Sequence, residues 1–70
     1  MSKAKKELKR KMTVYNRSIA EMNDIKSRLQ CAYSAFNNTS DDSMLDACIF
    51  EISALNARYN YAVKQIKQLE

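Results

Sequence analysis

A dense run of cations opens the chain. Residues 1–11 hold six cations against the single carboxylate of Glu7, a net charge of +5, whereas residues 12–70 hold six cations and seven carboxylates, a net charge of −1. Lysine and arginine at this density bind phosphates without sequence preference, which makes nucleic acid a candidate partner. A solvated helix start and contact with an anionic membrane surface are the alternative interpretations. The six cations are Lys3, Lys5, Lys6, Lys9, Arg10 and Lys11.

The residue types that perform catalysis or hold cofactors are poorly represented. The chain has no histidine and no glycine, and none of its serines or cysteines has an identifiable base, so nucleophilic catalysis and phosphate-binding loops are not expected. Asp41, Asp42 and Asp46 could chelate a cation, but a short acidic turn is more often a solvated helix cap. The sequence therefore predicts a protein that is not an enzyme and that has no cofactor and no metal.

The two cysteines and the hydropathy of the chain suggest where the protein is found. Cys31 and Cys48 are too far apart for a zinc-binding spacing, and we expect both to be free thiols in a reducing compartment. The basic start is not followed by an apolar signal-peptide segment, and no run of about 18 apolar residues could span a membrane. The prediction is a cytoplasmic protein without a membrane span.

A cluster of aromatic and polar side chains, Arg58-Tyr59-Asn60-Tyr61, is the remaining candidate for recognition. In the structural interpretation, the two tyrosine rings pack into two different interfaces with their hydroxyls at the rim. In the functional interpretation, Arg58 and Asn60 flank the rings of a binding patch. The structural interpretation is the one that we favour.

The helix that must position these residues runs through the second half of the chain, where two apolar stripes are visible. One is an unbroken heptad pattern that is typical of a helix–helix seam. The other lies nearly opposite the first around the helix, so that this helix needs neighbours on both sides. The seam consists of Leu45, Cys48, Ile52, Leu55, Tyr59, Ala62, Ile66 and Leu69. The second stripe consists of Ala47, Phe50, Ala54, Ala57 and Tyr61.

The first half of the chain predicts a helix with one apolar face. Its seam repeats every seven residues, and further apolar side chains flank it. Arg17, Glu21 and Arg28 are among the polar residues expected on the other side. The seam consists of Leu8, Tyr15, Met22, Leu29 and Phe36, with Met12, Ile19, Ile25, Ala32 and Tyr33 in flanking positions.

One break separates the two helices, at the polar residues from Asn37 to Asp42, which are poor helix formers. We predict residues 1–7 as a basic arm or a frayed helix start and residues 8–70 as a helical hairpin. The hairpin comprises a helix over about 5–37, a turn over about 38–41 and a helix over about 42–69. Asp41 is the expected N-cap of the second helix.

The fold class that follows is all-α: an antiparallel two-helix hairpin, which dimerises into a four-helix bundle. The second stripe, together with Arg58, is the predicted interface with the second chain or with another protein. An exposed Phe50 on a stripe of alanines is the clearest sign of such a partner. The predicted function is a small non-enzymatic interaction or adaptor protein. The alternative is a nucleic-acid-binding regulator that uses the basic N-terminus.

Several short motifs in residues 29–67 suggest a family. In order, they are Phe36-Asn37, Asp41, Leu45-Asp46, Ile49-Phe50-Glu51-Ile52, Arg58-Tyr59-Asn60-Tyr61 and Lys64. With these motifs the chain resembles the YaaL-like family of small proteins from Gram-positive, largely spore-forming bacteria. Members commonly carry proline where this chain has Asp42, and aspartate is also favourable in a first helical turn. The resemblance implies an all-helical cytoplasmic protein and implies no activity.

Overall fold

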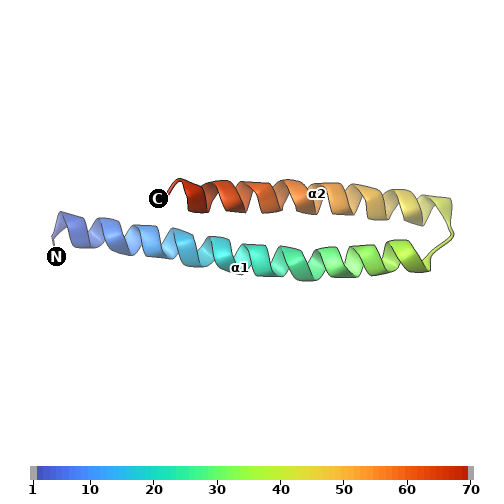
Figure 1. Ribbon diagram of the computed structural model, residues 1–70, viewed down its shortest axis with the longest axis horizontal. Coiled ribbons are helices and arrows are strands. Elements are labelled where there is room, and N and C mark those ends of the chain that lie inside the picture. The colour runs from blue at the N-terminus through green and yellow to red at the C-terminus, as the bar shows by residue number, and fades with distance from the viewer. Residues whose placement is uncertain (1, 70) are drawn as a thin grey trace.

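The chain forms two long antiparallel helices joined by a short connection (Figure 1). The structure is a computed structural model that describes residues 2–69. Helix α1 spans Lys3–Asn38 and helix α2 spans Asp42–Lys67, and together they form a rod of 59 × 15 × 14 Å. No strand occurs in the described residues. The predicted all-α fold with a two-helix hairpin is therefore confirmed.

Both helices begin at a side chain that caps the first free backbone amides. The hydroxyl of Ser2 accepts a hydrogen bond from the Lys5 amide at 3.2 Å, and α1 already starts at Lys3. Ser2 to Glu7 thus form the cap and first turn of a helix, while Met1 lies outside the described residues. Asp41 accepts a hydrogen bond from the Met44 amide at 2.9 Å, which makes it the N-cap of α2, as the sequence predicted.

The connection between the helices consists of residues 39–41. Thr39 and Asp41 both have extended backbone conformations, and the Asp41 amide donates a hydrogen bond to the Thr39 hydroxyl at 3.2 Å. Within residues 2–69 no residue has a positive φ. The chain therefore reverses without a left-handed residue, which is consistent with a sequence that lacks glycine.

The heptad seam of α2 faces α1 throughout its length. Cys48, Leu55 and Ala62 are buried, and the other five members of the seam are half-buried. Leu55 lies at the centre, where it packs with Ile25 and Ala32 of α1. The sequence interpretation of this stripe is confirmed in full.

The contact line of α1 lies on the predicted apolar face, but it runs through the flanking positions Ile25 and Ala32 and not through the predicted seam. Ser18, Ile25 and Ala32 form the buried line, whereas Leu8 is 59% exposed and Tyr15 is 48% exposed. The predicted seam lies four residues, or about 40° around the helix, away from this line. The physical reason is the small size of Ser18 and Ala32, which lets α2 approach closely while the bulkier side chains of the predicted seam turn to one flank.

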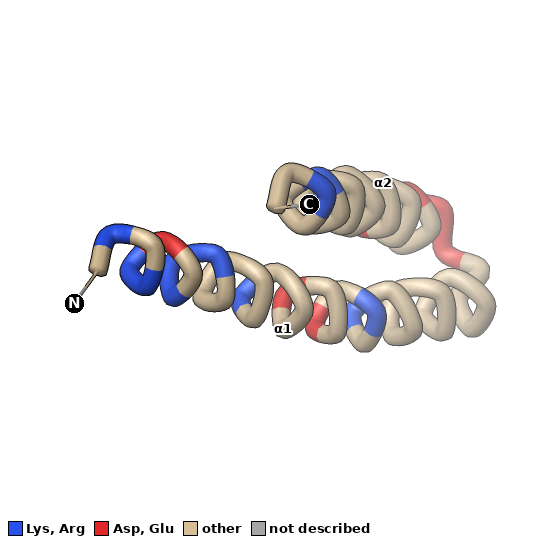
Figure 2. The backbone as a smooth tube through the Cα atoms, turned by 60° about the vertical axis from the view of Figure 1, so that its left-hand side comes forward, with Lys and Arg blue, Asp and Glu red and all other residues tan. Residues whose placement is uncertain are grey.

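The two ends of the rod carry opposite charges. The first turns of α1 extend beyond the end of α2, and they hold the cationic run (Figures 1 and 2). Lys64 and Lys67 of α2 lie at the same end of the hairpin. At the other end, Asp41 and Asp42 open α2 (Figure 2). The rod is thus electrically polar along its length.

Candidate interaction surfaces

The second apolar stripe of α2 lies on the surface. All five members of this α2 stripe are exposed, with Phe50 at 73% and Tyr61 at 66% of their full accessible area. Phe50 follows the buried Cys48 by two residues, about 200° around the helix, so it points away from α1. The hairpin leaves this stripe without cover, and the small side chains of Ala54 and Ala57 leave room for another helix to approach.

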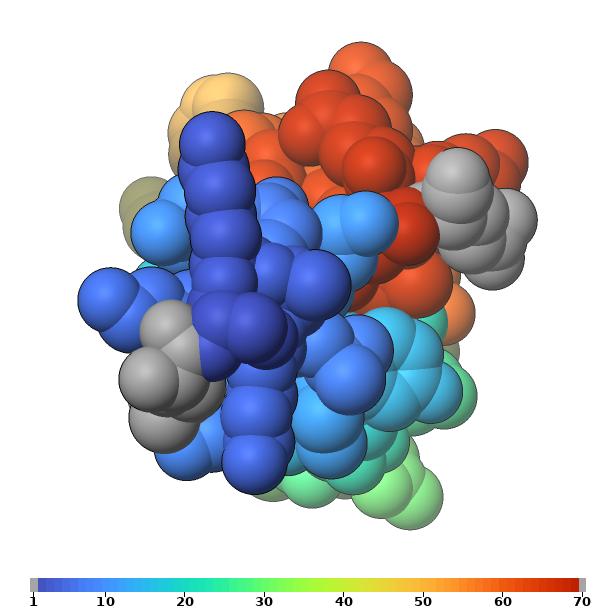
Figure 3. Space-filling view, turned by 90° about the vertical axis from the view of Figure 1, so that its left-hand side faces the viewer, coloured from blue at the N-terminus to red at the C-terminus, as the bar shows by residue number. Residues whose placement is uncertain are grey.

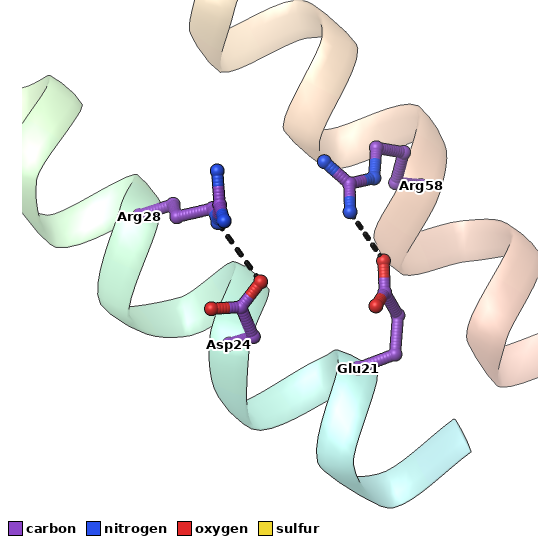
Figure 4. A network of polar contacts seen from close by, with 4 residues as sticks. All are labelled: Glu21, Asp24, Arg28 and Arg58. Carbon is purple, nitrogen blue, oxygen red and sulfur yellow. Dashed lines mark hydrogen bonds and ion pairs between the residues drawn. The ribbon is translucent and has the colours of Figure 1, made fainter. Parts of the chain in front are cut away.

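Arg58, which the sequence placed beside the stripe, reaches back to α1. Its guanidinium donates a hydrogen bond to a carboxylate oxygen of Glu21 at 2.5 Å, and this ion pair joins the two helices (Figure 4). A second ion pair, between Arg28 and Asp24 at 2.8 Å, lies beside it on α1. Glu21 was predicted on the polar outer side of α1, but it is half-buried at the edge of the helix–helix contact. Sequence spacing alone could not indicate a partner 37 residues away.

The rest of the aromatic motif divides between core and surface. Tyr59 is half-buried and packs against the core cluster around Leu55. Asn60 and Tyr61 are exposed. Tyr59 thus lies in the helix–helix contact, as the structural interpretation predicted, whereas the second interface that it gives Tyr61 stays a prediction. Arg58, Asn60 and Tyr61 are accessible from outside the hairpin.

A shallow groove beside the Arg58–Glu21 ion pair has a volume of about 510 Å³. Val14, Ala57 and Ala62 are among its apolar lining residues, and Arg17, Ser18 and Gln65 contribute polar groups. Val14 is half-buried there, although the sequence interpretation had left it outside the apolar face. The groove thus offers charged and apolar groups in open contact with solvent.

The two cysteines lie on one groove of the hairpin. A depression of about 450 Å³ is lined by both Cys31 of α1 and Cys48 of α2. Cys31 is exposed, Cys48 is buried, and both are free thiols. Ala32, Ala35 and Ala47 line the same depression, and Ser27, Arg28 and Glu51 contribute polar or charged groups to it.

A second uncovered apolar surface runs along the hairpin, and the sequence interpretation had assigned most of it to the core. We call it the heptad face. Its members come from the flank of α1 to which the predicted seam has turned and from one position of α2. The exposed residues of the heptad face are Leu8, Met12, Tyr15, Tyr33, Phe36 and Ile49.

The signal for the heptad face was present in the sequence. The line next to the predicted seam contains Lys11, Ser18, Ile25 and Ala32, of which only Ile25 is large and apolar. Small side chains along a helix let a second helix approach closely, so they favour the contact within the hairpin. The large side chains of the neighbouring seam favour the packing of a further helix against α1. Both lines fit the helical period, so the sequence predicts one broad apolar face where the structure has two lines in different environments.

The cations of the N-terminus surround the first turns of α1. Figure 3 views the rod from this end, and the side chains of these turns spread in several directions around the helix. Lys3, Lys5, Lys6, Lys9, Arg10 and Lys11 are all exposed. Arg10 donates a hydrogen bond to Glu7 at 3.3 Å, which offsets one of the six positive charges locally. We call these turns, residues 3–11, the basic overhang.

The described part of the chain has neither a metal-binding cluster nor a membrane-spanning stretch. In residues 2–69, no three side chains of histidine, cysteine, aspartate or glutamate are close enough together to hold a metal ion. Within the same residues, neither helix has a stretch long and apolar enough to cross a membrane.

Comparison with known proteins gives no match: no family model, no curated protein and no solved structure is similar to this chain. The resemblance to the YaaL-like family therefore stays a prediction, and function has to be argued from the surfaces of the hairpin.

Proposed function

We propose that this chain is a small non-enzymatic interaction protein, an adaptor, that acts as an oligomer of helical hairpins, in the simplest case a homodimeric four-helix bundle. The observation that carries the proposal is how little the hairpin buries by itself. Among the described residues, only Ile25 and Leu55 are large and fully buried. The other buried hydrophobic residues, Ala32, Cys48 and Ala62, are small.

A chain of 70 residues with so small a core needs additional stabilisation. Disulfides, metals and partner chains are the usual sources, and the two cysteines of this chain are unpaired. Nine large apolar side chains are exposed on the described hairpin. A stable monomer of this size rarely leaves so much apolar surface in contact with water. Covering them with a second chain would remove apolar surface from water, and each Å² buried stabilises the assembly by about 25 cal/mol.

The adaptor role follows from the presence of two separate apolar surfaces. Ile49 of the heptad face and Phe50 of the α2 stripe are adjacent in sequence, so they point about 100° apart around α2. One surface can hold a second copy while the other holds a different protein. The cytoplasmic location implied by the YaaL-like resemblance is part of this proposal.

Sedimentation equilibrium over a dilution series tests the proposal. We expect a species of twice the chain mass of 8.1 kDa, with helicity that falls on dilution as the species dissociates. A chain that remains monomeric and fully helical at high concentration would contradict the proposal, because the hairpin would then be stable with its apolar side chains exposed to water.

A second candidate function is contact with nucleic acid through the basic overhang. The supporting observation is that residues 3–11 form an ordered helix that extends beyond α2, with its cations exposed around it. Phosphates could approach this helix from several directions, and the affinity would depend strongly on salt and little on sequence.

Mobility-shift titrations at several salt concentrations test this second candidate. We compare the wild-type chain with Lys6→Ala/Lys9→Ala, which removes two cations of the overhang. Arg17→Ala/Arg28→Ala is the matched control, because it removes the same charge from the middle of the rod. If the overhang binds phosphates, the first pair should lower the slope of log K against log salt by about 2 and the control should leave it unchanged. An equal loss in both pairs would mean that only net charge matters.

A further inference from the structure

The predicted seam of α1, which we call the heptad column, does not coincide with the line on which α2 packs. Leu8, Tyr15, Met22, Leu29 and Phe36 keep a spacing of seven residues over four heptads, the period at which one helix packs along another. Yet α2 packs on the neighbouring line of Ser18, Ile25 and Ala32. The column thus lies on a flank of the hairpin. Leu29 packs against the core cluster and Met22 is half-buried, whereas Leu8, Tyr15 and Phe36 are exposed.

Helix α2 extends the same flank. Tyr33 follows the buried Ala32 by one residue, and Ile49 follows the buried Cys48 by one residue. Because the helices are antiparallel, one step past the contact line turns both side chains to the same side of the hairpin. Met12 and Tyr33 are three heptads apart and share this side. The heptad face is therefore a broad surface built from both helices, not a single stripe.

Building on the proposed self-association, we infer that the heptad face is the surface on which a second copy of this chain packs, antiparallel to the first and related to it by a two-fold axis near Met22. The α2 stripe then stays free for another protein. Two independent features of the structure support this occupant and this orientation.

The first feature is the symmetry of the apolar pattern. The exposed members of the face gather at its two ends, with Leu8, Met12 and Tyr15 near the overhang and Tyr33 and Phe36 near the connection. The column is symmetric in spacing about Met22. A two-fold axis at this residue brings Leu8 of one copy to the level of Phe36 of the other and Tyr15 to the level of Leu29. Each exposed end thus covers the other, as an isologous interface requires.

The second feature is the distribution of charge. In the antiparallel arrangement, the basic overhang of each copy lies beside the acidic start of α2 of the other copy. Lys5 precedes Met12 by seven residues and Asp42 precedes Ile49 by seven, so one charge of each sign lies on the heptad face itself. A parallel arrangement would instead place the two overhangs together, with like charges side by side.

Sedimentation of the wild-type chain and of two variants tests which face forms the dimer. Tyr15→Glu places a charge in the proposed interface, and Phe50→Glu is the matched control on the α2 stripe. Both sites are exposed in the single hairpin, so its own core is untouched. We expect Tyr15→Glu to raise the dissociation constant of the dimer at least about 30-fold and Phe50→Glu to leave it within a few-fold. The reverse result would assign the dimer to the α2 stripe and overturn the inference, while the proposed oligomer would stand. A monomeric wild-type chain would contradict both.

Charge reversal tests the orientation. Lys5→Glu and Asp42→Lys should each weaken the dimer several-fold at low salt, and the double variant should recover wild-type affinity because both contacts are then reversed together. Additive weakening in the double variant would contradict the antiparallel pairing of the ends.

Cross-linking provides a measurement that does not depend on a destabilising variant. In a background with Cys31→Ser and Cys48→Ala, chains with Leu8→Cys are mixed with chains with Phe36→Cys and oxidised with diamide. We expect disulfide-linked heterodimers from the mixture and few homodimers from either chain alone. Homodimers from each chain alone would indicate a parallel dimer, and the lack of any cross-link would mean that the heptad face is not the interface.

Discussion

Truncation of Leu55 to alanine should remove a large part of the stability of the hairpin. Leu55 is 2% exposed and packs against Ile25 and Ala32, so the side chain is lost from the best-filled point between the helices. The three missing carbons cost about 2.4 kcal/mol at about 0.8 kcal/mol each. The cavity raises the loss in the free energy of unfolding to about 3–4 kcal/mol. A chain of this size has only roughly 4–10 kcal/mol of stability, and the melting temperature should fall by about 12–30 °C.

Two further truncations on α2 calibrate this prediction. Ile52 is half-buried on the same seam, so Ile52→Ala should cost an amount near the lower end of about 2–4 kcal/mol. Met44 is exposed and lies outside the heptad face, so Met44→Ala should change stability by less than about 0.5 kcal/mol. Circular dichroism melts at several protein concentrations measure all three, because a change in the core persists at every concentration while a change in association does not.

The expected order of destabilisation is Leu55→Ala, then Ile52→Ala, then Met44→Ala. If Met44→Ala lowers the melting temperature as much as Leu55→Ala does, then Leu55 is not at the centre of the contact. The register that places it opposite Ile25 would be refuted.

Two smaller effects follow from polar contacts. Asp41→Ala removes the N-cap of α2 next to the connection between the helices, and it should cost about 1 kcal/mol. Ser2→Ala removes the N-cap of α1 at the end that extends beyond α2, and it should cost less. Equal effects of the two variants in thermal melts would contradict this. A double-mutant cycle on Arg58 and Glu21 should give a coupling energy below about 1 kcal/mol, because both side chains are more than 40% exposed, and a larger coupling would mean that the ion pair is shielded by another chain.

The α2 seam could be predicted from sequence alone because its heptad pattern is unbroken from Leu45 to Leu69, whereas the second stripe of this helix is shorter and consists mostly of alanines. Every member from Leu45 to Leu69 is buried or half-buried in the structure. The N-cap at Asp41 was equally predictable, since it depends on a local hydrogen bond to an amide three residues away. Fold class, helix number and the place of the connection all depend on such local signals.

The contact line of α1 could not be predicted in the same way. Two adjacent lines, one through Met22 and one through Ile25, both fit the helical period, and composition favours the line with the larger side chains. Only the opposing helix decides between them. Helix α2 packs where Ser18 and Ala32 allow close approach, and the larger residues are left for another contact.

The sequence by itself determined that this chain makes two amphipathic helices, where the second begins, and that its charge is concentrated at one end. Periodicity, capping and composition are properties of neighbouring residues, so they need no tertiary information. The tertiary structure decided which flank of α1 is covered, that Arg58 pairs with Glu21, and that two apolar surfaces stay exposed. These outcomes depend on how closely two helix surfaces fit when brought together, and side-chain volume at the contact, not the pattern along either helix, sets that fit.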